Sequence, residues 1–304
     1  MSKPDKKYKG VIVPMISPLN KDLSIDELAV EMIVQTFWQN SIEPFVLGTT
    51  GESVSLSVNQ KNNLVKYTIK AMQGKGKTFA GISGNSLFDS IEEAKRYTDL
   101  GVDAVVAHLP FYYPISADQM LKYYEKLAES LKCDLFLYNN PITTNISIPI
   151  EVIDKLSYHP NIVGIKDSER GQERLDESIK NWADRADFVH LLGWAAQSAY
   201  SVLNGSDGIV PSTANITPSL YKELYDAALM GDFKKAFEIQ ETTNKVSEIY
   251  QKNRKLNESL PALKLMMSFY GLCKPYVMPP MQMLGETSDE EIKEAMVIEM
   301  SDLL

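Results

Sequence analysis

Residues 104–166 read AVVAHLPFYYPISADQMLKYYEKLAESLKCDLFLYNNPITTNISIPIEVIDKLSYHPNIVGIK. This stretch holds three short apolar runs, at 104–108, 135–138 and 162–166, which amphipathic segments at 116–131 and 149–158 separate. The runs are rich in Val, Ile and Leu and mostly lack polar alternation, which is typical of strands buried on both faces. Each run and the segment after it have the length of a βα unit, so the stretch predicts parallel strands joined by helices.

The same alternation continues in both directions along the chain. Eight runs are predicted as strands, at 10–16, 44–48, 78–82, 104–108, 135–138, 162–166, 188–192 and 208–210. Eight segments are predicted as helices, at 24–40, 57–72, 86–100, 116–131, 149–158, 172–182, 195–203 and 218–230. Eight such units predict an α/β fold, a (β/α)8 TIM barrel. A doubly wound open sheet is the alternative, and the absence of GxGxxG and GxxxxGK(S/T) motifs speaks against it.

The chain continues past the eighth unit with segments of helical pattern only. Three helices are expected there, at 232–254, 259–270 and 288–300. We therefore predict a catalytic barrel over residues 1–230 and a C-terminal helical extension over residues 231–304 that packs on the barrel.

Composition excludes several classes of protein. The chain has 304 residues, of which 44% are hydrophobic and 23% charged, as in globular proteins. The net charge of −9 opposes a nucleic-acid or anionic-membrane binder, which needs a basic face. Cys133 and Cys273 form no disulfide framework, and the N-terminus has no apolar signal segment, so we expect a cytoplasmic protein.

In a barrel, function lies where the strands end at their C-terminal side. Lys166 ends the sixth run, after four small or apolar residues, and strand alternation should place it inside the barrel mouth. An ammonium there is poorly solvated, which lowers its pKa, and a neutral lysine attacks carbonyl carbon to form an imine. A solvated or ion-paired surface lysine is the alternative interpretation.

Two further strand ends carry candidate groups. Tyr138 ends the fifth run, where a phenol could move protons beside an imine or could simply pack for its area. Thr49, Thr50 and Gly51, after the second run, could cradle a carboxylate with hydroxyls and backbone N–H groups or could form a plain tight turn.

The histidines and one aromatic stretch are the remaining candidates, for a metal site and for a lid. The three histidines, His108, His159 and His190, lie on different units without ligand-like spacing, so no metal site is predicted. The aromatic stretch 111–113 could pack, form a lid or contact a subunit.

Three motifs taken together resemble one known family. GTTGE at 48–52, YNNP at 138–141 and GIKDS at 164–168 are similar to motifs of the dihydrodipicolinate synthase / N-acetylneuraminate lyase family of pyruvate-dependent class I aldolases. The resemblance extends over essentially the whole chain. It implies a barrel with a helical tail, imine chemistry without metal or organic cofactor, and a homotetramer built from tight dimers.

The resemblance also implies roles for individual residues. Lys166 would form the imine with pyruvate or another 2-oxo acid, and Tyr138 would be the general acid and base. Thr50 would relay protons between Tyr138 and Tyr112, a tyrosine that reaches into a neighbouring subunit's site. The groups expected to bind substrate are Thr49, Thr50, Gly51, Thr143 and the backbone carbonyl of Val210.

The sequence departs from the synthase pattern at several positions. Synthases of dihydrodipicolinate carry arginine where this chain has Thr143, and threonine cannot supply a bidentate contact to a carboxylate. Asn145 stands in place of a glycine, and Val58 and Lys61 replace two histidines of the regulatory lysine site. The triplet at 166–168 is closer to aldolases of 2-keto-3-deoxy sugar acids. Asn145, Trp194 and Ser212 are further candidates for the pocket wall.

These observations predict a lyase that cleaves or condenses a 2-oxo acid, with pyruvate and an aldehyde as the other partners. A 2-keto-3-deoxy sugar acid is the favoured substrate. The alternatives are 4-hydroxy-tetrahydrodipicolinate synthase, N-acetylneuraminate lyase, and a dehydratase or hydratase-aldolase of the same family. Outside this class stands a non-catalytic barrel that binds 2-oxo acids. Nucleic acid and membrane partners are not expected.

Overall fold

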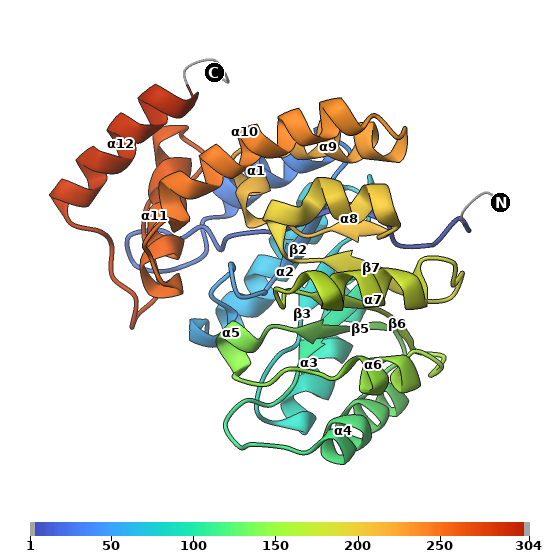
Figure 1. The fold of residues 1–304 in the computed structure, drawn as a ribbon. Helices are drawn as coiled ribbons and strands as arrows, with labels where there is room; N and C mark the ends of the chain where they lie inside the picture. The colour runs from blue at the N-terminus through green and yellow to red at the C-terminus, as the bar shows by residue number, and fades with distance from the viewer. Residues whose placement is uncertain (1–3, 301–304) are drawn as a thin grey trace.

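The computed structural model describes residues 4–300, and Figure 1 shows the fold. Eight parallel strands pair in chain order and close into a barrel, because β1 pairs with both β2 and β8. The strands are β1 (Gly10–Pro14), β2 (Glu43–Val46), β3 (Phe79–Gly81), β4 (Ala104–His108), β5 (Asp134–Asn139), β6 (Ile162–Asp167), β7 (Val189–Leu192) and β8 (Gly208–Ile209). The predicted TIM barrel is confirmed, and each predicted strand is present.

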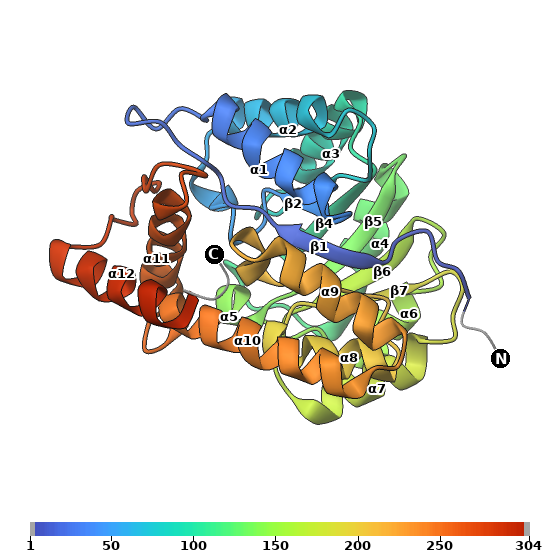
Figure 2. The same ribbon diagram turned by 90° about the horizontal axis from the view of Figure 1, so that it is seen from above.

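Helices follow the strands and surround the barrel, as the view from above shows (Figure 2). They are α1 (Glu27–Gln39), α2 (Val58–Met72), α3 (Leu87–Leu100), α4 (Ala117–Ser130), α5 (Pro141–Thr144), α6 (Ile150–Leu156), α7 (Gln172–Trp182), α8 (Ser198–Asn204) and α9 (Pro218–Leu229). The eight predicted helices are confirmed within a few residues. The single turn α5 was not predicted, and the first residues predicted for α8 form a separate 3-10 turn.

Serine caps explain where two helices begin. The hydroxyls of Ser57 and Ser116 accept hydrogen bonds from the backbone N–H groups of Gln60 and Gln119, at 3.3 Å in each case. Both glutamine side chains reach back to the serine N–H at 2.8 Å, which completes a capping box. These caps fix the points at which α2 and α4 leave the loops of the barrel mouth.

Alternate strand residues fill the barrel interior. The rings of Tyr8, Phe79 and Phe136 meet edge to face there, with centroids 5.2–5.6 Å apart. Gly164 on β6 makes room for this packing, since a Cβ at that position would stand 2.5 Å from a ring carbon of Phe136. The strand side chains that point outward form the larger core with the helices.

The segment before β1 closes the N-terminal end of the barrel. The buried Lys6 Nζ donates to the carbonyls of Trp182 and Phe188, at 2.9 and 2.8 Å, and pairs with the Asp207 carboxylate at 2.8 Å. The Tyr8 hydroxyl lies 2.8 Å from a carboxylate oxygen of Asp134 and 3.0 Å from the Asp103 carbonyl.

The C-terminal helices are α10 (Phe233–Gln251), α11 (Leu256–Phe269) and α12 (Glu286–Met300). α10 packs on α8 and α9, and α12 lies at the edge of the molecule against α10 and α11 (Figures 1 and 2). The boundary between residues 230 and 231 stays a prediction, and residues 1–3 and 301–304 of the two predicted parts lie outside the described residues. Among residues 4–300, no helix is long and apolar enough to cross a membrane.

Candidate active site

Three polar side chains lie in register near the C-terminal ends of β4, β5 and β6. His108 pairs with Tyr138 across β4 and β5, and Tyr138 pairs with Lys166 across β5 and β6. Residues paired in register in a parallel sheet project to the same face, and Tyr138 belongs to the interior cluster of the barrel. The three side chains therefore meet inside the C-terminal mouth.

Lys166 is buried, with 5% of its surface exposed. Its Nζ lies 4.2 Å from the ring centroid of Tyr138 and 4.7 Å from that of Phe45. No carboxylate of residues 4–300 lies within ion-pair distance of it. Burial lowers the pKa of Lys166, and the neighbouring Tyr138 offsets this only in part. An amine in this setting is neutral, and so nucleophilic, at a lower pH than a surface lysine.

The hydroxyl of Tyr138 lies in a small polar network. It is 3.2 Å from the Thr49 hydroxyl, and the Asn140 amide donates to it at 3.1 Å. Burial by itself favours the neutral phenol, but the charge of Lys166 and the hydrogen bond with Thr49 outweigh it and lower the pKa of Tyr138. A phenol with a lowered pKa beside a lysine is suited to move protons to and from a group bound at the lysine.

The structure corrects the expected partner of Tyr138. We expected Thr50 to contact the phenol, but among the described residues the threonine hydroxyl in contact with it is that of Thr49. Thr49 lines the cavity at the barrel mouth, and Thr50 is buried elsewhere in the turn. Side chains of adjacent residues in a turn point in different directions, so the motif alone could not decide between them. Gly51 fits the same turn tightly, since a Cβ there would stand 3.0 Å from the Met15 carbonyl.

The glutamate of the GTTGE motif holds the turn in place. Glu52 forms an ion pair with Lys264 of α11, and both side chains are almost fully buried. The Met278 N–H donates to the same carboxylate at 2.7 Å, and Lys264 donates to the Tyr276 carbonyl at 2.8 Å. Sequence reasoning missed this pair, although a lysine inside the apolar run of α11 was a signal that it needed a buried partner.

A cavity of about 300 Å³ opens beside Tyr138. The turn after β2, the ends of β3 to β5, α11 and residues 280–281 form its wall. Its neutral polar groups include Thr49, Ser83, His108, Thr143 and Asn257, and its apolar groups include Leu47, Val54, Phe111, Leu256, Leu260 and Met281. No lysine or arginine stands among its lining residues within the described part of the chain.

The structure places the remaining predicted residues in different surroundings. Thr143 lines the cavity, and Val210 belongs to the interior cluster of the barrel. Asn145 ends α5 in the left-handed region, with φ of 55°, which asparagine adopts more readily than most residues with a side chain. Trp194 packs beside the cluster of Leu175, Ile179 and Leu192, and the Ser212 hydroxyl lies 2.8 Å from that of Tyr250.

Tyr112 stands apart from the other groups in this single chain. It is 74% exposed on the loop after β4, and its ring meets that of Tyr113 at a centroid distance of 5.0 Å. The chain therefore does not bring Tyr112 to Tyr138 by itself, and the predicted relay needs a tyrosine supplied by another copy.

His108 is the site residue that sequence reasoning passed over. It has no role among the predicted site residues, although it ends the predicted fourth strand, and the structure places it in the row with Tyr138 and Lys166. Its ring centroid lies 6.2 Å from that of Tyr138. The available signal was its position, since the predicted strand 104–108 ends at His108 as its neighbour ends at Tyr138. Within residues 4–300, no group of three or more His, Cys, Asp or Glu is placed to hold a metal ion.

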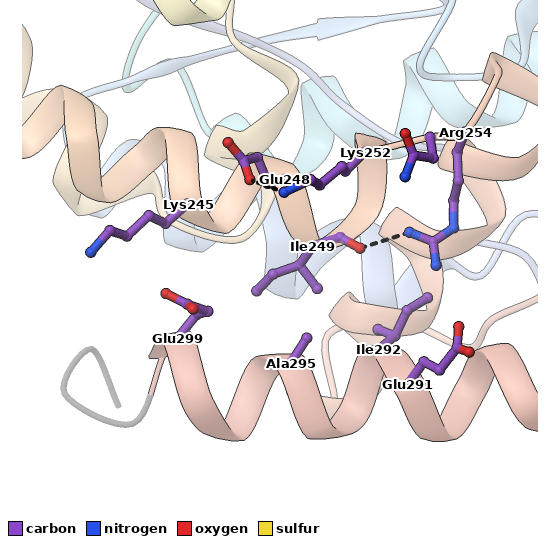
Figure 3. Close-up of a pocket in the computed structure, with 10 residues that line it drawn as sticks. Lys245, Glu248, Ile249, Lys252, Arg254, Glu291, Ile292, Ala295 and Glu299 are labelled. Atoms are coloured by element: carbon purple, nitrogen blue, oxygen red, sulfur yellow. Dashed lines mark hydrogen bonds and ion pairs between the residues drawn. The ribbon is translucent and has the colours of Figure 1, made fainter.

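A second cavity, of about 610 Å³, lies between α10 and α12, away from these groups (Figure 3). The figure shows Ile292 and Ala295 of α12 pointing toward α10, with charged side chains around them. Lys252 pairs with Glu248 at 3.1 Å, and Arg254 donates to the Ile249 carbonyl at 2.9 Å. Cations and carboxylates both line this groove, so its wall favours neither a negatively nor a positively charged ligand.

Comparisons with known proteins give matches over nearly the whole chain. The model of the dihydrodipicolinate synthetase family matches residues 7–298. A DapA-like lyase of Thermofilum pendens is 30% identical over 296 residues, which cover 96% of each chain. The N-acetylneuraminate lyase of Clostridium perfringens is 28% identical over 294 residues, or 94% of this chain and 98% of that protein. The structure of dihydrodipicolinate synthase from Bacteroides thetaiotaomicron is 30% identical, with a TM-score of 0.91 over 96% of this chain and 99% of that one.

Proposed function

This chain belongs to the dihydrodipicolinate synthetase family, and we propose that it cleaves a 2-keto-3-deoxy sugar acid to pyruvate and an aldehyde. Membership of the family makes it a pyruvate-dependent lyase of the class I aldolase type. The proposal therefore concerns the substrate and the residues that act on it.

The observation that carries the substrate proposal is the wall of the cavity beside Tyr138, whose one charged side chain among the described residues, Glu52, is already paired with Lys264. A partner aldehyde with its own carboxylate, such as aspartate semialdehyde, binds more strongly where a cation makes a charge-assisted contact to it, and no lysine or arginine among the described residues lines the cavity. Thr143 stands where the synthases carry arginine. Hydroxyl, amide and imidazole groups instead suit an aldehyde that carries several hydroxyls.

The reaction begins at Lys166. Its neutral amine attacks C2 of the 2-oxo acid, and loss of water leaves a protonated imine. Backbone N–H groups of the turn after β2 hold the carboxylate of the substrate. Tyr138 takes the proton from the C4 hydroxyl, the C3–C4 bond breaks, and its electron pair moves toward the imine nitrogen to give an enamine. The aldehyde leaves, C3 takes up a proton, and water releases pyruvate from Lys166.

The proton relay in this proposal runs through Thr49, in place of the Thr50 expected from the motif. The distance of 3.2 Å between the hydroxyls of Thr49 and Tyr138 supports that assignment. The exposed Tyr112 would complete the relay in a neighbouring subunit. The homotetramer and the cytoplasmic location stay predictions.

Borohydride trapping followed by a substrate panel tests the proposal. Pyruvate with borohydride should add one reduced pyruvyl group to Lys166, as located by peptide mass mapping. Pyruvate release should then show a higher kcat/KM with 2-keto-3-deoxygluconate than with N-acetylneuraminate, and condensation with aspartate semialdehyde should be the slowest reaction. The absence of an adduct in folded protein would contradict the chemistry, and aspartate semialdehyde as the best substrate would contradict the substrate class.

A further inference from the structure

The imidazole of His108 is a buried polar group that the mechanism above does not use. It is 7% exposed and lines the cavity beside Tyr138. Its backbone N–H donates to the Ser83 hydroxyl at 3.1 Å, and its ring packs against Phe111 with centroids 5.6 Å apart. The backbone of His108 is therefore held by Ser83, and its ring lies between the rings of Phe111 and Tyr138 in reach of both.

One nitrogen of the ring is already engaged, and this defines what the other can do. Nδ1 lies 2.7 Å from the Leu109 carbonyl, which can only accept, so Nδ1 carries the proton. Burial lowers the pKa of His108, so the ring is neutral at ordinary pH. Nε2 then has a free lone pair, and no hydrogen bond within residues 4–300 engages it.

We propose that His108 Nε2 accepts a hydrogen bond from the first hydroxyl of the substrate beyond the bond that breaks, the hydroxyl on C5. The row across the three strands supports this assignment, because its order matches the order of groups along the substrate. Lys166 binds C2, Tyr138 on the next strand serves the C4 hydroxyl, and His108 stands one strand further on. The inference rests on the proposed function and adds the residue that selects hydroxylated aldehydes.

A buried hydrogen-bond acceptor of this kind discriminates against ligands that bring no donor to pair with it. An aldehyde with a methyl group in place of the hydroxyl cannot donate to Nε2, so the imidazole is desolvated without compensation when that aldehyde binds. His108 is therefore a specificity residue: it favours 2-hydroxyaldehydes over their deoxy analogues and takes no part in forming the imine.

The test compares two aldehydes of equal size in condensation with pyruvate. Glycolaldehyde has the hydroxyl and propionaldehyde has a methyl group in its place. The wild-type enzyme should prefer glycolaldehyde by about tenfold in kcat/KM. The ratio should fall to about one in His108→Phe and should stay partly above one in His108→Gln, whose amide oxygen can accept. His159→Phe, on a loop outside the site, is the matched control and should keep the wild-type ratio.

A ratio measured on one sample is independent of how much of a variant has folded, because inactive protein lowers both rates equally. An unchanged preference in His108→Phe would overturn the role of His108 and leave the proposed function standing. A wild-type enzyme that forms the pyruvate adduct yet shows no preference would do the same. Failure of the wild-type enzyme to form any adduct or product would overturn both proposals.

Discussion

The two ends of the barrel each bury a lysine and a tyrosine, and the two pairs have different surroundings. At the N-terminal end, Lys6 meets two carbonyls and the Asp207 carboxylate, and Tyr8 lies beside Asp134. At the C-terminal end, Lys166 lies against aromatic rings without a carboxylate partner among the described residues. The same two residue types thus lie beside carboxylates at one end and beside neutral groups and each other at the other end.

The pKa values of the two tyrosines shift in opposite directions because of this difference. Burial and the neighbouring Asp134 carboxylate raise the pKa of Tyr8. The pKa of Tyr138 is lowered despite its burial, because Lys166 and Thr49 stabilise the phenolate. A buried tyrosine beside a carboxylate keeps its proton and holds the fold, whereas one beside a lysine can release it. The comparison teaches that the partner, and not burial alone, separates a structural pair from a chemical one.

The largest effect should come from replacing each lysine by methionine. Lys166→Met should abolish the borohydride adduct and lower kcat/KM by more than about 10⁴-fold, because the covalent route needs the amine. Lys6→Met should keep the adduct but lower the free energy of unfolding by about 3–5 kcal/mol, since Asp207 loses its buried cation. Mass spectrometry and urea denaturation measure the two quantities.

Loss of the adduct in a folded Lys6→Met protein would remove the distinction between the two ends. So would an adduct that persists in Lys166→Met, since another amine would then be the nucleophile.

The tyrosine pair should separate in the same way with smaller effects. Tyr138→Phe should lower kcat by about 10²–10⁴-fold because the general acid and base is lost, while trapping still shows an adduct on Lys166. Tyr8→Phe should cost about 1–3 kcal/mol of stability, because the Asp134 carboxylate and the Asp103 carbonyl lose a donor. Single-turnover rates and denaturation curves of both variants provide the comparison. Equal kcat losses in the two variants would contradict it.

The smallest effect concerns the pH dependence of stability. The pKa of Lys166 is lowered in the folded protein, whereas the pKa of a lysine in an unfolded chain is about 10.4. Between the two values the unfolded chain binds more protons, so Lys166 costs stability at neutral pH and the cost fades as pH rises toward the unfolded value. Lys166→Met should therefore gain stability over the wild-type protein at neutral pH.

The stability gained in Lys166→Met should shrink by at most about 1.4 kcal/mol per pH unit through that window. Urea denaturation of both proteins from pH 7 to 10.5 measures the difference, and both carry Tyr138→Phe because the pKa of Tyr138 depends on Lys166 and would not cancel. A difference that stays flat with pH would mean that Lys166 is charged in the folded protein.

The fold and the two central groups of the site could be predicted from sequence because they depend on local patterns. Short apolar runs and amphipathic segments define the eight units, and Lys166 and Tyr138 are placed by ending adjacent strands. The choice between Thr49 and Thr50 depends on the path of a turn, which residue types do not specify. The pairing of Glu52 with Lys264 joins segments far apart in the chain, and only the closed barrel brings them together.

That buried pair has a consequence for how proteins of this kind can be recombined. A chimera that took its strands from one relative and its last helices from another would have to exchange the residues at positions 52 and 264 together. A fragment that ended after α9 would keep every strand, yet it would bury the Glu52 carboxylate without a cation and lose the part of the cavity wall formed by Leu256 and Leu260. The barrel and the C-terminal helices must therefore be exchanged together, although they follow one another along the chain as separate segments.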